Sequence, residues 1–199
     1  MEQETRSTQP VTGSENPIAE DINKVASPHA PTGSPVLDDM LDRIAGLYPD
    51  AVEEAFVGVD MPTIRVAPGR VVDVCRWLRD DPGLRFVMLS DLTCVDHLDR
   101  EPRFDVVYHL CSLKNRSRVR VKTGIAANPA ECPTMTEVWA GANWAEREVW
   151  DMYGVRFVGH PGLDRILSPE GWEYFALRRD FPLQGPGMIK LFDNVTDVF

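Results

Sequence analysis

The sequence predicts an α+β fold, in which a mixed β-sheet carries packed helices and is followed by an extended C-terminal strap. Apolar residues recur at helical spacing in two stretches of the first half, and apolar and polar residues alternate in several short runs. A segment of about 30 residues near the C-terminus shows little periodicity of either kind. We therefore expect a disordered arm at 1–34, an α+β domain at 35–140, and a capped helix with an extended partner-binding segment at 141–199.

The N-terminal arm is predicted from its composition. Residues 1–34 contain no aromatic side chain and are rich in Pro, Ser, Thr, Glu and Gly. Such a segment cannot bury enough apolar surface to offset the entropy that ordering costs. Its polar start lacks the apolar core of a secretory signal, and no run in the chain approaches the roughly 18–20 apolar residues that span a bilayer. The net charge of −10 argues against nucleic-acid binding and against direct attraction to an anionic membrane.

Two helices are expected in the α+β domain. The first begins at Ser34-Pro35, a capping residue followed by proline, and ends near Pro49. Its inward face carries four apolar residues: Leu37, Met40, Leu41 and Ile44. The second opens at Pro68 and stops at 82–83, where proline and glycine follow each other. Its inward face carries Val71, Val74, Cys75 and Leu78.

The strands are predicted from alternating runs. Two short strands at 51–60 and 62–68 flank a turn, and 84–98 is expected to form a longer, bent or bulged strand. The clearest hairpin joins 103–113 to 117–122. In its second strand, basic side chains share one face: Arg116, Arg118, Arg120 and Lys122. We interpret them as a solvated outer sheet face; binding of phosphate or an acidic partner is the alternative, and no aromatic motif favours nucleic acid.

The four cysteines give no ligand pattern. They stand alone in the sequence, without a C-x-x-C pair that would indicate a zinc site or an iron–sulfur cluster: Cys75, Cys94, Cys111 and Cys132. Cys94 and Cys111 could lie in neighbouring strands. We predict reduced thiols packed in the core, since no export signal is visible.

A third helix is expected from Trp144 to Tyr153. Asn143 is a suitable N-cap, and Glu146 follows three residues later, as in a capping box. Gly154 stands where a left-handed C-cap residue belongs. In this interpretation Glu146 has a structural role at the start of the helix.

Charged side chains on this helix invite a catalytic interpretation. Arg147 and Asp151 lie four residues apart and are predicted to pair along the helix. Glu146, Glu148 and Asp151 could supply paired carboxylates for acid–base chemistry. However, Arg147 is interleaved with them, and the chain has no G-x-S-x-G, G-x-G-x-x-G or P-loop motif. An independent active site is therefore not favoured.

His160 is a candidate metal ligand by residue type alone. It precedes Pro161, which favours extended geometry, and no second histidine lies at ligand spacing from it. His97 and His109 are distant in sequence, and nothing in the pattern brings them together. We expect His160 to be a buried hydrogen-bonding or interface residue.

The segment after Gly154 is predicted to bind a partner. It ends in a dense group of charges at 178–180 and carries many apolar and aromatic side chains that need burial: Phe157, Leu163, Ile166, Leu167, Trp172, Tyr174, Phe175 and Leu177. A segment that wraps over a surface, with aromatic and arginine anchors, meets this need.

The C-terminal third also resembles a known family. The run GANWAEREVWDMYGVRFVGHPGLDRIL, followed by LRRDFPL, closely resembles the C subunit of bacterial NADH–quinone oxidoreductase, respiratory complex I, and its mitochondrial and chloroplast counterparts. The upstream run RFDVVYHLCSLKNRSRVRVK is similar to the central hairpin of that family. The resemblance covers about 36–186 and is strongest over 141–183. It implies that the signature residues fix the helix and dock the strap: Glu146, Arg147, Glu148, Asp151, Tyr153, Gly159, His160, Pro161, Arg165, Arg178, Arg179 and Asp180.

The resemblance implies a function without an active site in this chain. Members of the family lie in the peripheral arm of the proton-pumping complex, on the cytoplasmic face of the bacterial inner membrane, and bind no cofactor themselves. FMN and iron–sulfur clusters belong to partner subunits, with the B, D and I subunits expected as neighbours. Two other functions stay open: the equivalent subunit of a membrane-bound hydrogenase or other non-NADH complex, and a stand-alone hydrolase or metal enzyme.

Two positions depart from the family pattern. Asp164 stands where the family usually has Arg or Lys, and Ala176 where it usually has Pro. The first reverses a charge and puts one expected ion pair in doubt. The chain ends at Phe199, so we expect a free-standing C subunit rather than a fusion with the D subunit.

Overall fold

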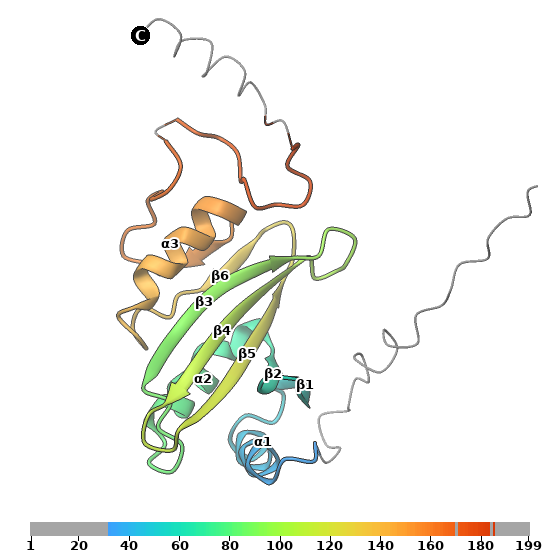
Figure 1. The fold of residues 1–199 in the computed structure, drawn as a ribbon, viewed down its shortest axis with the longest axis vertical. Coiled ribbons are helices and arrows are strands. Elements are labelled where there is room, and N and C mark those ends of the chain that lie inside the picture. The colour runs from blue at the N-terminus through green and yellow to red at the C-terminus, as the bar shows by residue number, and fades with distance from the viewer. Residues whose placement is uncertain (1–31, 170, 184, 186–199) are drawn as a thin grey trace, which may run out of the picture.

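A five-stranded mixed sheet forms the centre of the molecule (Figure 1). The computed structural model describes residues 32–169, 171–183 and 185, so almost all of the predicted N-terminal arm lies outside the described residues. The strand order is β1-β2-β5-β4-β3, with β2 and β5 parallel and the other neighbours antiparallel. The strands are β1 (Val52–Val57), β2 (Pro62–Val66), β3 (Met88–Asp96), β4 (Phe104–Ser112) and β5 (Ser117–Ile125). The predicted α+β class is confirmed.

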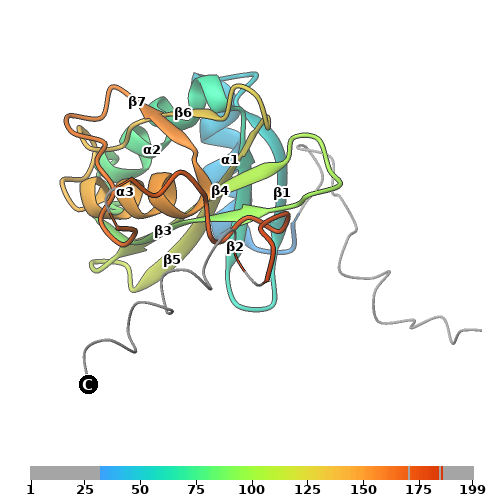
Figure 2. The same cartoon turned by 90° about the horizontal axis from the view of Figure 1, so that it is seen from above.

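Two helices pack on one face of this sheet, α1 (Pro35–Leu47) and α2 (Val71–Asp80) (Figures 1 and 2). All eight residues predicted to face inward from them are buried. Helix α1 begins at Pro35 as predicted, although the Ser34 side chain forms no capping hydrogen bond. The second helix begins later than expected, because a 3₁₀ turn, η1 (Pro68–Arg70), comes first.

Strand β3 is shorter than predicted. It begins at Met88 rather than Leu84, because Arg85 adopts a left-handed backbone (φ 51°) and its N–H donates to the Asp81 carbonyl. The pairing with β4 shifts register between Leu89 and Asp91, which is the predicted bulge. The hairpin of β4 and β5 is as predicted, with β5 continuing three residues further, to Ile125.

A second, two-stranded sheet was not predicted. Strands β6 (Glu131–Pro133) and β7 (Arg156–Val158) pair in parallel on either side of α3 (Ala142–Tyr153) in the chain. Three residues are too few for a strand to show alternation, so the sequence carries no signal for it. Helix α3 lies against the edge strand β3 of the main sheet.

One hydrophobic core joins the five-stranded sheet and its helices to α3 and the two-stranded sheet. Val149 of α3 and Phe157 of β7 belong to the same buried cluster as the residues of α1, α2 and the main sheet. The four cysteines are free thiols; three are buried and Cys111 is half-buried, and Cys132 Sγ lies 3.3 Å from the Tyr108 hydroxyl. Within the described part of the chain, no helix is both long and apolar enough to cross a bilayer.

Candidate functional site

The helix that carries the charged signature starts earlier than predicted. Helix α3 begins at Ala142, and Gly141 before it already has a helical backbone. Asn143 is therefore inside the helix, and the predicted N-cap and capping box are wrong. The predicted C-cap is confirmed, because Gly154 adopts the left-handed conformation (φ 73°) and its N–H donates to the Trp150 carbonyl. The glycine is also required by packing, since a Cβ there would lie 2.5 Å from Phe175 Cζ.

Glu146 ties α3 to the turn after β6. Its side chain is fully buried; Oε1 accepts a hydrogen bond from the Met135 backbone N–H at 2.5 Å, and Oε2 accepts one from Thr134 Oγ1 at 2.6 Å. Burial raises the pKa of this carboxyl to about 7, although both hydrogen bonds act to lower it. Glu146 therefore has a structural role, as predicted, but at a different place from the helix start.

Asp151 anchors the segment that follows β7. Its Oδ2 accepts hydrogen bonds from three consecutive backbone N–H groups, at 2.9, 2.7 and 2.9 Å: Ile166, Leu167 and Ser168. Its Oδ1 accepts a hydrogen bond from Arg165 Nη1 at 2.8 Å. Burial alone would raise the pKa of this carboxyl, but the hydrogen bonds from Ser168, Leu167 and Arg165 outweigh burial and hold the pKa well below its usual range. The carboxylate is charged and fully buried.

The predicted pair between Arg147 and Asp151 is wrong, because Arg165 is the arginine that binds Asp151. Arg147 instead donates from Nε to the Asp164 carbonyl at 3.1 Å, and its guanidinium lies 4.8 Å from the ring centre of Trp144. Since any residue at 164 supplies this carbonyl, the unusual charge of Asp164 leaves the contact intact. The Trp144 ring is 65% exposed.

Arg178 points into the molecule. Its Nε donates to the Tyr153 carbonyl at 2.5 Å, and its guanidinium lies 4.4 Å from the Phe175 ring centre and 5.3 Å from that of Phe104. Burial lowers the pKa of Arg178, assisted by the charge of neighbouring Arg103. Arg178 therefore joins α3, the main sheet and the C-terminal segment.

The next two signature residues have opposite orientations. Asp180 pairs with Arg103 at 2.9 Å, and Arg103 also binds Asp96 of β3. The backbone N–H of Arg179 donates to Asp96 Oδ2 at 2.8 Å. The Arg179 side chain is exposed, and among the described residues no carboxylate lies within 4.0 Å of its guanidinium. Arg178 is half-buried and its neighbour Arg179 is exposed, and the sequence alone could not predict which of the two would point inward.

His160 stabilises the loop before the anchored segment. Its Nδ1 accepts a hydrogen bond from the Gly162 N–H at 3.1 Å, so its Nε2 carries the proton and donates to the Asn143 carbonyl at 3.2 Å. Gly159 beside it has φ 87°, and Pro161 is exposed. Within the part of the chain that the structure describes, no group of three His, Cys, Asp or Glu side chains could hold a metal ion.

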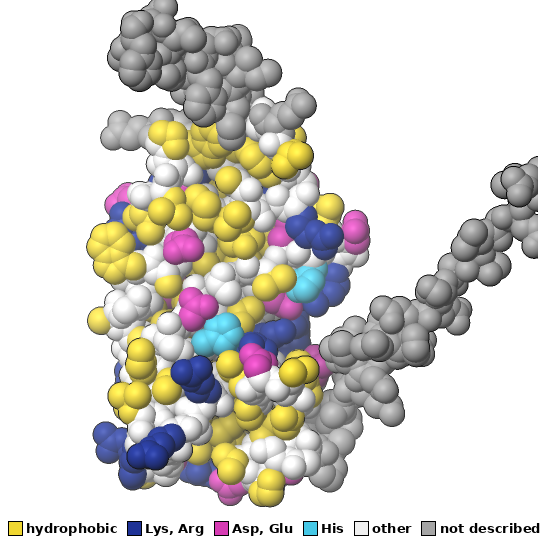
Figure 3. Space-filling model, viewed as in Figure 1, with side chains coloured by type: hydrophobic (Ala, Val, Ile, Leu, Met, Phe, Trp, Pro, Cys, Tyr) yellow, Lys and Arg dark blue, Asp and Glu magenta, His cyan; other side chains and the backbone are white. Residues whose placement is uncertain are grey.

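Apolar side chains stay exposed around this region. Trp172, Tyr174 and Phe181 form an aromatic cluster, with ring centres 5.4 to 6.4 Å apart. In Figure 3, hydrophobic surface covers much of the upper part of the face shown. The large exposed side chains of α3, β7 and the C-terminal segment are Trp144, Val158, Leu167, Tyr174, Leu177 and Leu183. Trp144 was not singled out from the sequence, although its place on the outer side of an amphipathic helix could have indicated it.

The fold and the site together define a class of protein. It is an α+β domain in which buried carboxylates anchor a C-terminal segment, while arginine and aromatic side chains of the kind found in protein–protein interfaces stay exposed. The description "Respiratory-chain NADH dehydrogenase, 30 Kd subunit" belongs to a family model that matches residues 64–187. Because this match spans more than half of the chain, the protein belongs to that family.

Similar sequences carry a consistent name. The C subunit of NADH-quinone oxidoreductase from Roseiflexus castenholzii is 51% identical over 146 residues, which are 72% of this chain and 83% of that protein. A C subunit of NADH-quinone oxidoreductase from Rhizobium meliloti is 49% identical over 145 residues, which are 73% of this chain and 79% of that protein.

Two solved structures are also similar. One, described as "Nqo5 of the trypsin-resistant fragment (1-134)", has a TM-score of 0.51 and 29% identity, and it covers 62% of this chain and 99% of its own. The other is a chain of the archaeal membrane-bound sulfane sulfur reductase, with a TM-score of 0.63 and 23% identity, over 81% of this chain and 92% of its own. At that identity the second likeness is one of fold alone.

Proposed function

We propose that this chain is a structural subunit, without an active site of its own, in the peripheral arm of a proton-translocating NADH:quinone oxidoreductase. Its membership of the 30 kDa subunit family carries the proposal. The geometry agrees with it, because the two buried carboxylates of α3 are occupied by contacts within the chain: Glu146 holds the turn at 134–135, and Asp151 holds the backbone at 166–168. Neither is available as an acid or base for a substrate.

The chain then supports electron transfer from NADH to quinone by holding other subunits in place. In this proposal FMN and the iron–sulfur clusters belong to those partners, with the B, D and I subunits as neighbours. The chain reaches the cytoplasmic face of the bacterial inner membrane only through the complex. The names of its relatives support NADH as the donor.

Two groups of residues carry different parts of this role. Asp151, Arg165, Arg178 and Asp180 hold the C-terminal segment on its own domain through the contacts described above. Trp144 and Leu177, 65% and 52% exposed, and the Arg179 side chain face outward. Tryptophan and arginine dominate the binding energy of many interfaces, so we assign the partner contacts to this outward group.

Affinity purification from membranes tests the proposal. The tagged chain should bring down the other subunits of the complex, including those that carry FMN and the NADH site. Trp144→Ala and Arg179→Glu should reduce this recovery, whereas Arg70→Glu, at an exposed arginine of η1, should not. Recovery of nickel-bearing hydrogenase subunits would replace NADH:quinone oxidoreductase by the alternative complex, and an active monomer would overturn both.

A further inference from the structure

The opposite end of the main sheet carries a separate concentration of positive charge. It is formed by the loop after α2 and by the turn between β4 and β5, and we call it the basic end, defined by Arg85, Lys114, Arg116 and Arg118. All four residues are exposed. Among the described residues no carboxylate lies within 4.0 Å of these four cationic groups, although the chain as a whole has a net charge of −10. In Figure 3, Lys and Arg side chains gather at the lower left.

The two loops of the basic end are joined by hydrogen bonds. The Ser112 hydroxyl donates to the Leu84 carbonyl at 2.6 Å, and Asn115 Nδ2 donates to the carbonyls of Gly83 and Leu84 at 2.6 and 2.9 Å. Lys114 Nζ lies 3.3 Å from the Pro82 carbonyl. The positive charges are therefore displayed on a rigid support rather than on independent loops.

Arginine occupies both of the strained backbone positions at this end. Arg85 and Arg116 have φ of 51° and 50°, and they are the non-glycine residues with positive φ in the described part of the chain. A left-handed backbone is unfavourable for a residue with a Cβ atom, and Gly would avoid this cost. Strain kept at an exposed position is typical of functional sites. At these two positions the chain carries an arginine, although glycine would fit the backbone with less strain.

On the neighbouring part of the same sheet face, the positive charge is neutralised by carboxylates of the chain itself. Arg120 binds Asp60 at 2.6 Å and donates from Nε to His109 Nε2, while His109 Nδ1 lies 3.3 Å from Asp91. One step along the sheet, Arg118 aligns with Cys111 and Met88, neither of which can neutralise it. The charges of the basic end thus lack the internal partners that the adjacent row has.

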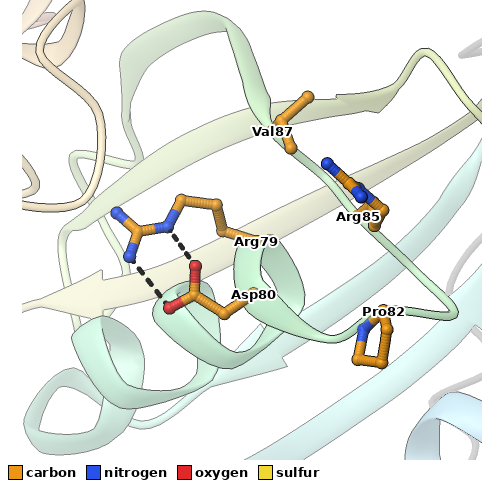
Figure 4. Close-up of a pocket in the computed structure, with 5 residues that line it drawn as sticks. All are labelled: Arg79, Asp80, Pro82, Arg85 and Val87. Carbon is orange, nitrogen blue, oxygen red and sulfur yellow. Dashed lines mark hydrogen bonds and ion pairs between the residues drawn. The ribbon is translucent and has the colours of Figure 1, made fainter.

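Apolar side chains adjoin these charges. Val87, Met88 and Leu113 are 44%, 46% and 66% exposed. Arg85 and Val87 also line a shallow hollow together with Arg79, Asp80 and Pro82 (Figure 4). In this hollow Arg79 is already paired with Asp80, so Arg85 supplies the unpaired charge.

We propose that the basic end binds an acidic, partly apolar segment of another protein chain. Carboxylates of that segment would meet Arg85, Arg116 and Arg118, and one apolar side chain would cover Leu113 and Met88. Complementary charge favours such a segment, and the exposed apolar residues favour a peptide over a free anion. This surface is distinct from the outward group around Trp144. It depends on the proposed function only in that the partner is sought within the assembled complex.

Photo-cross-linking in the complex tests the proposal. Benzoylphenylalanine is placed at Leu113 or, in a second variant, at Val87, with fully exposed Val59 of the β1–β2 turn as the control position. The expected product joins either test position to a peptide of another chain that has more Asp and Glu than Lys and Arg. Arg116→Glu/Arg118→Glu should lower its yield about tenfold, as a loss of about 1.4 kcal/mol of binding requires. Arg70→Glu/Arg76→Glu, which changes the net charge equally, should not.

Several outcomes would overturn the proposal: cross-links to residues 1–31 of the same chain, to lipid, or to a basic peptide, or yields no higher than at Val59. Equal yields from both charge-reversal variants would also overturn it. The subunits that co-purify are scored in the same samples. A normal complex without the cross-link rejects the basic end alone, whereas absence of the complex around the wild-type chain rejects the proposed function.

Discussion

Replacing Asp151 with asparagine should release the C-terminal segment from α3 while the core stays folded. The carboxylate accepts three backbone hydrogen bonds through Oδ2 and one from Arg165 through Oδ1, and it is fully buried. An asparagine oxygen could keep the backbone donors, but its NH₂ group would then face the Arg165 guanidinium. The substitution removes the negative charge and leaves Arg165 without its partner.

The size of the effect follows from these contacts. Hydrogen bonds to charged groups contribute about 1.5–3 kcal/mol, and breaking a buried ion pair from one side costs about 3–5 kcal/mol. A loss of about 3 kcal/mol increases the open population of the segment about 100-fold. The loss in global stability should be smaller, because the segment can detach while the sheet and its helices persist.

Hydrogen exchange measures this opening directly. The amides of Ile166, Leu167 and Ser168 should exchange about 100-fold faster in Asp151→Asn, and trypsin should cleave after Arg165 more readily. Glu148→Gln is the matched control, since it makes the same chemical change at an exposed position of the same helix. Unchanged protection of the three amides in Asp151→Asn would refute the anchoring role.

The depressed pKa of Asp151 adds a pH dependence. In the unfolded chain an aspartate titrates near pH ~3.9. A carboxyl whose pKa is lower in the folded state stabilises that state fully above this value, and the contribution is lost as pH falls toward the folded pKa. The segment should therefore open in acid below about pH 4 in the wild type, and Asp151→Asn should lack this transition.

Two further predictions concern neighbouring residues. Burial raises the pKa of Glu146 from 4.5 to about 7, so the folded chain binds the proton more tightly and its stability should fall as pH rises through this interval. The free energy of unfolding, measured with urea, should fall by about 3 kcal/mol more in the wild type than in Glu146→Gln as pH rises from below to above this interval. The same pH dependence in both variants would contradict this. Gly154→Ala should lower the melting temperature more than Gly171→Ala. Both glycines are left-handed, but only at Gly154 would a Cβ meet Phe175 and Arg178, at 2.5 and 2.6 Å, and equal melting temperatures would argue against that contact.

Local patterns were sufficient for much of the fold. The inward faces of α1 and α2 were predicted residue by residue, because helical periodicity reflects burial on one side. The β4–β5 hairpin and the left-handed Gly154 also follow from neighbouring residues. The short strands β6 and β7 could not be predicted, since they depend on pairing between distant segments. The late start of β3 was also missed, because nothing in the residue type of Arg85 indicates its left-handed backbone.

The sequence by itself determined the fold class and the family signature. Only the tertiary structure decided which partner each charged residue has. Glu146 binds residues 134 and 135, and Asp151 binds residues 165–168, separations that no helical repeat relates. It also decided that Arg178 points inward and Arg179 outward. The reason is physical: composition and periodicity record how often a residue is buried, whereas a buried charge is stable only where folding brings its partners to hydrogen-bonding distance.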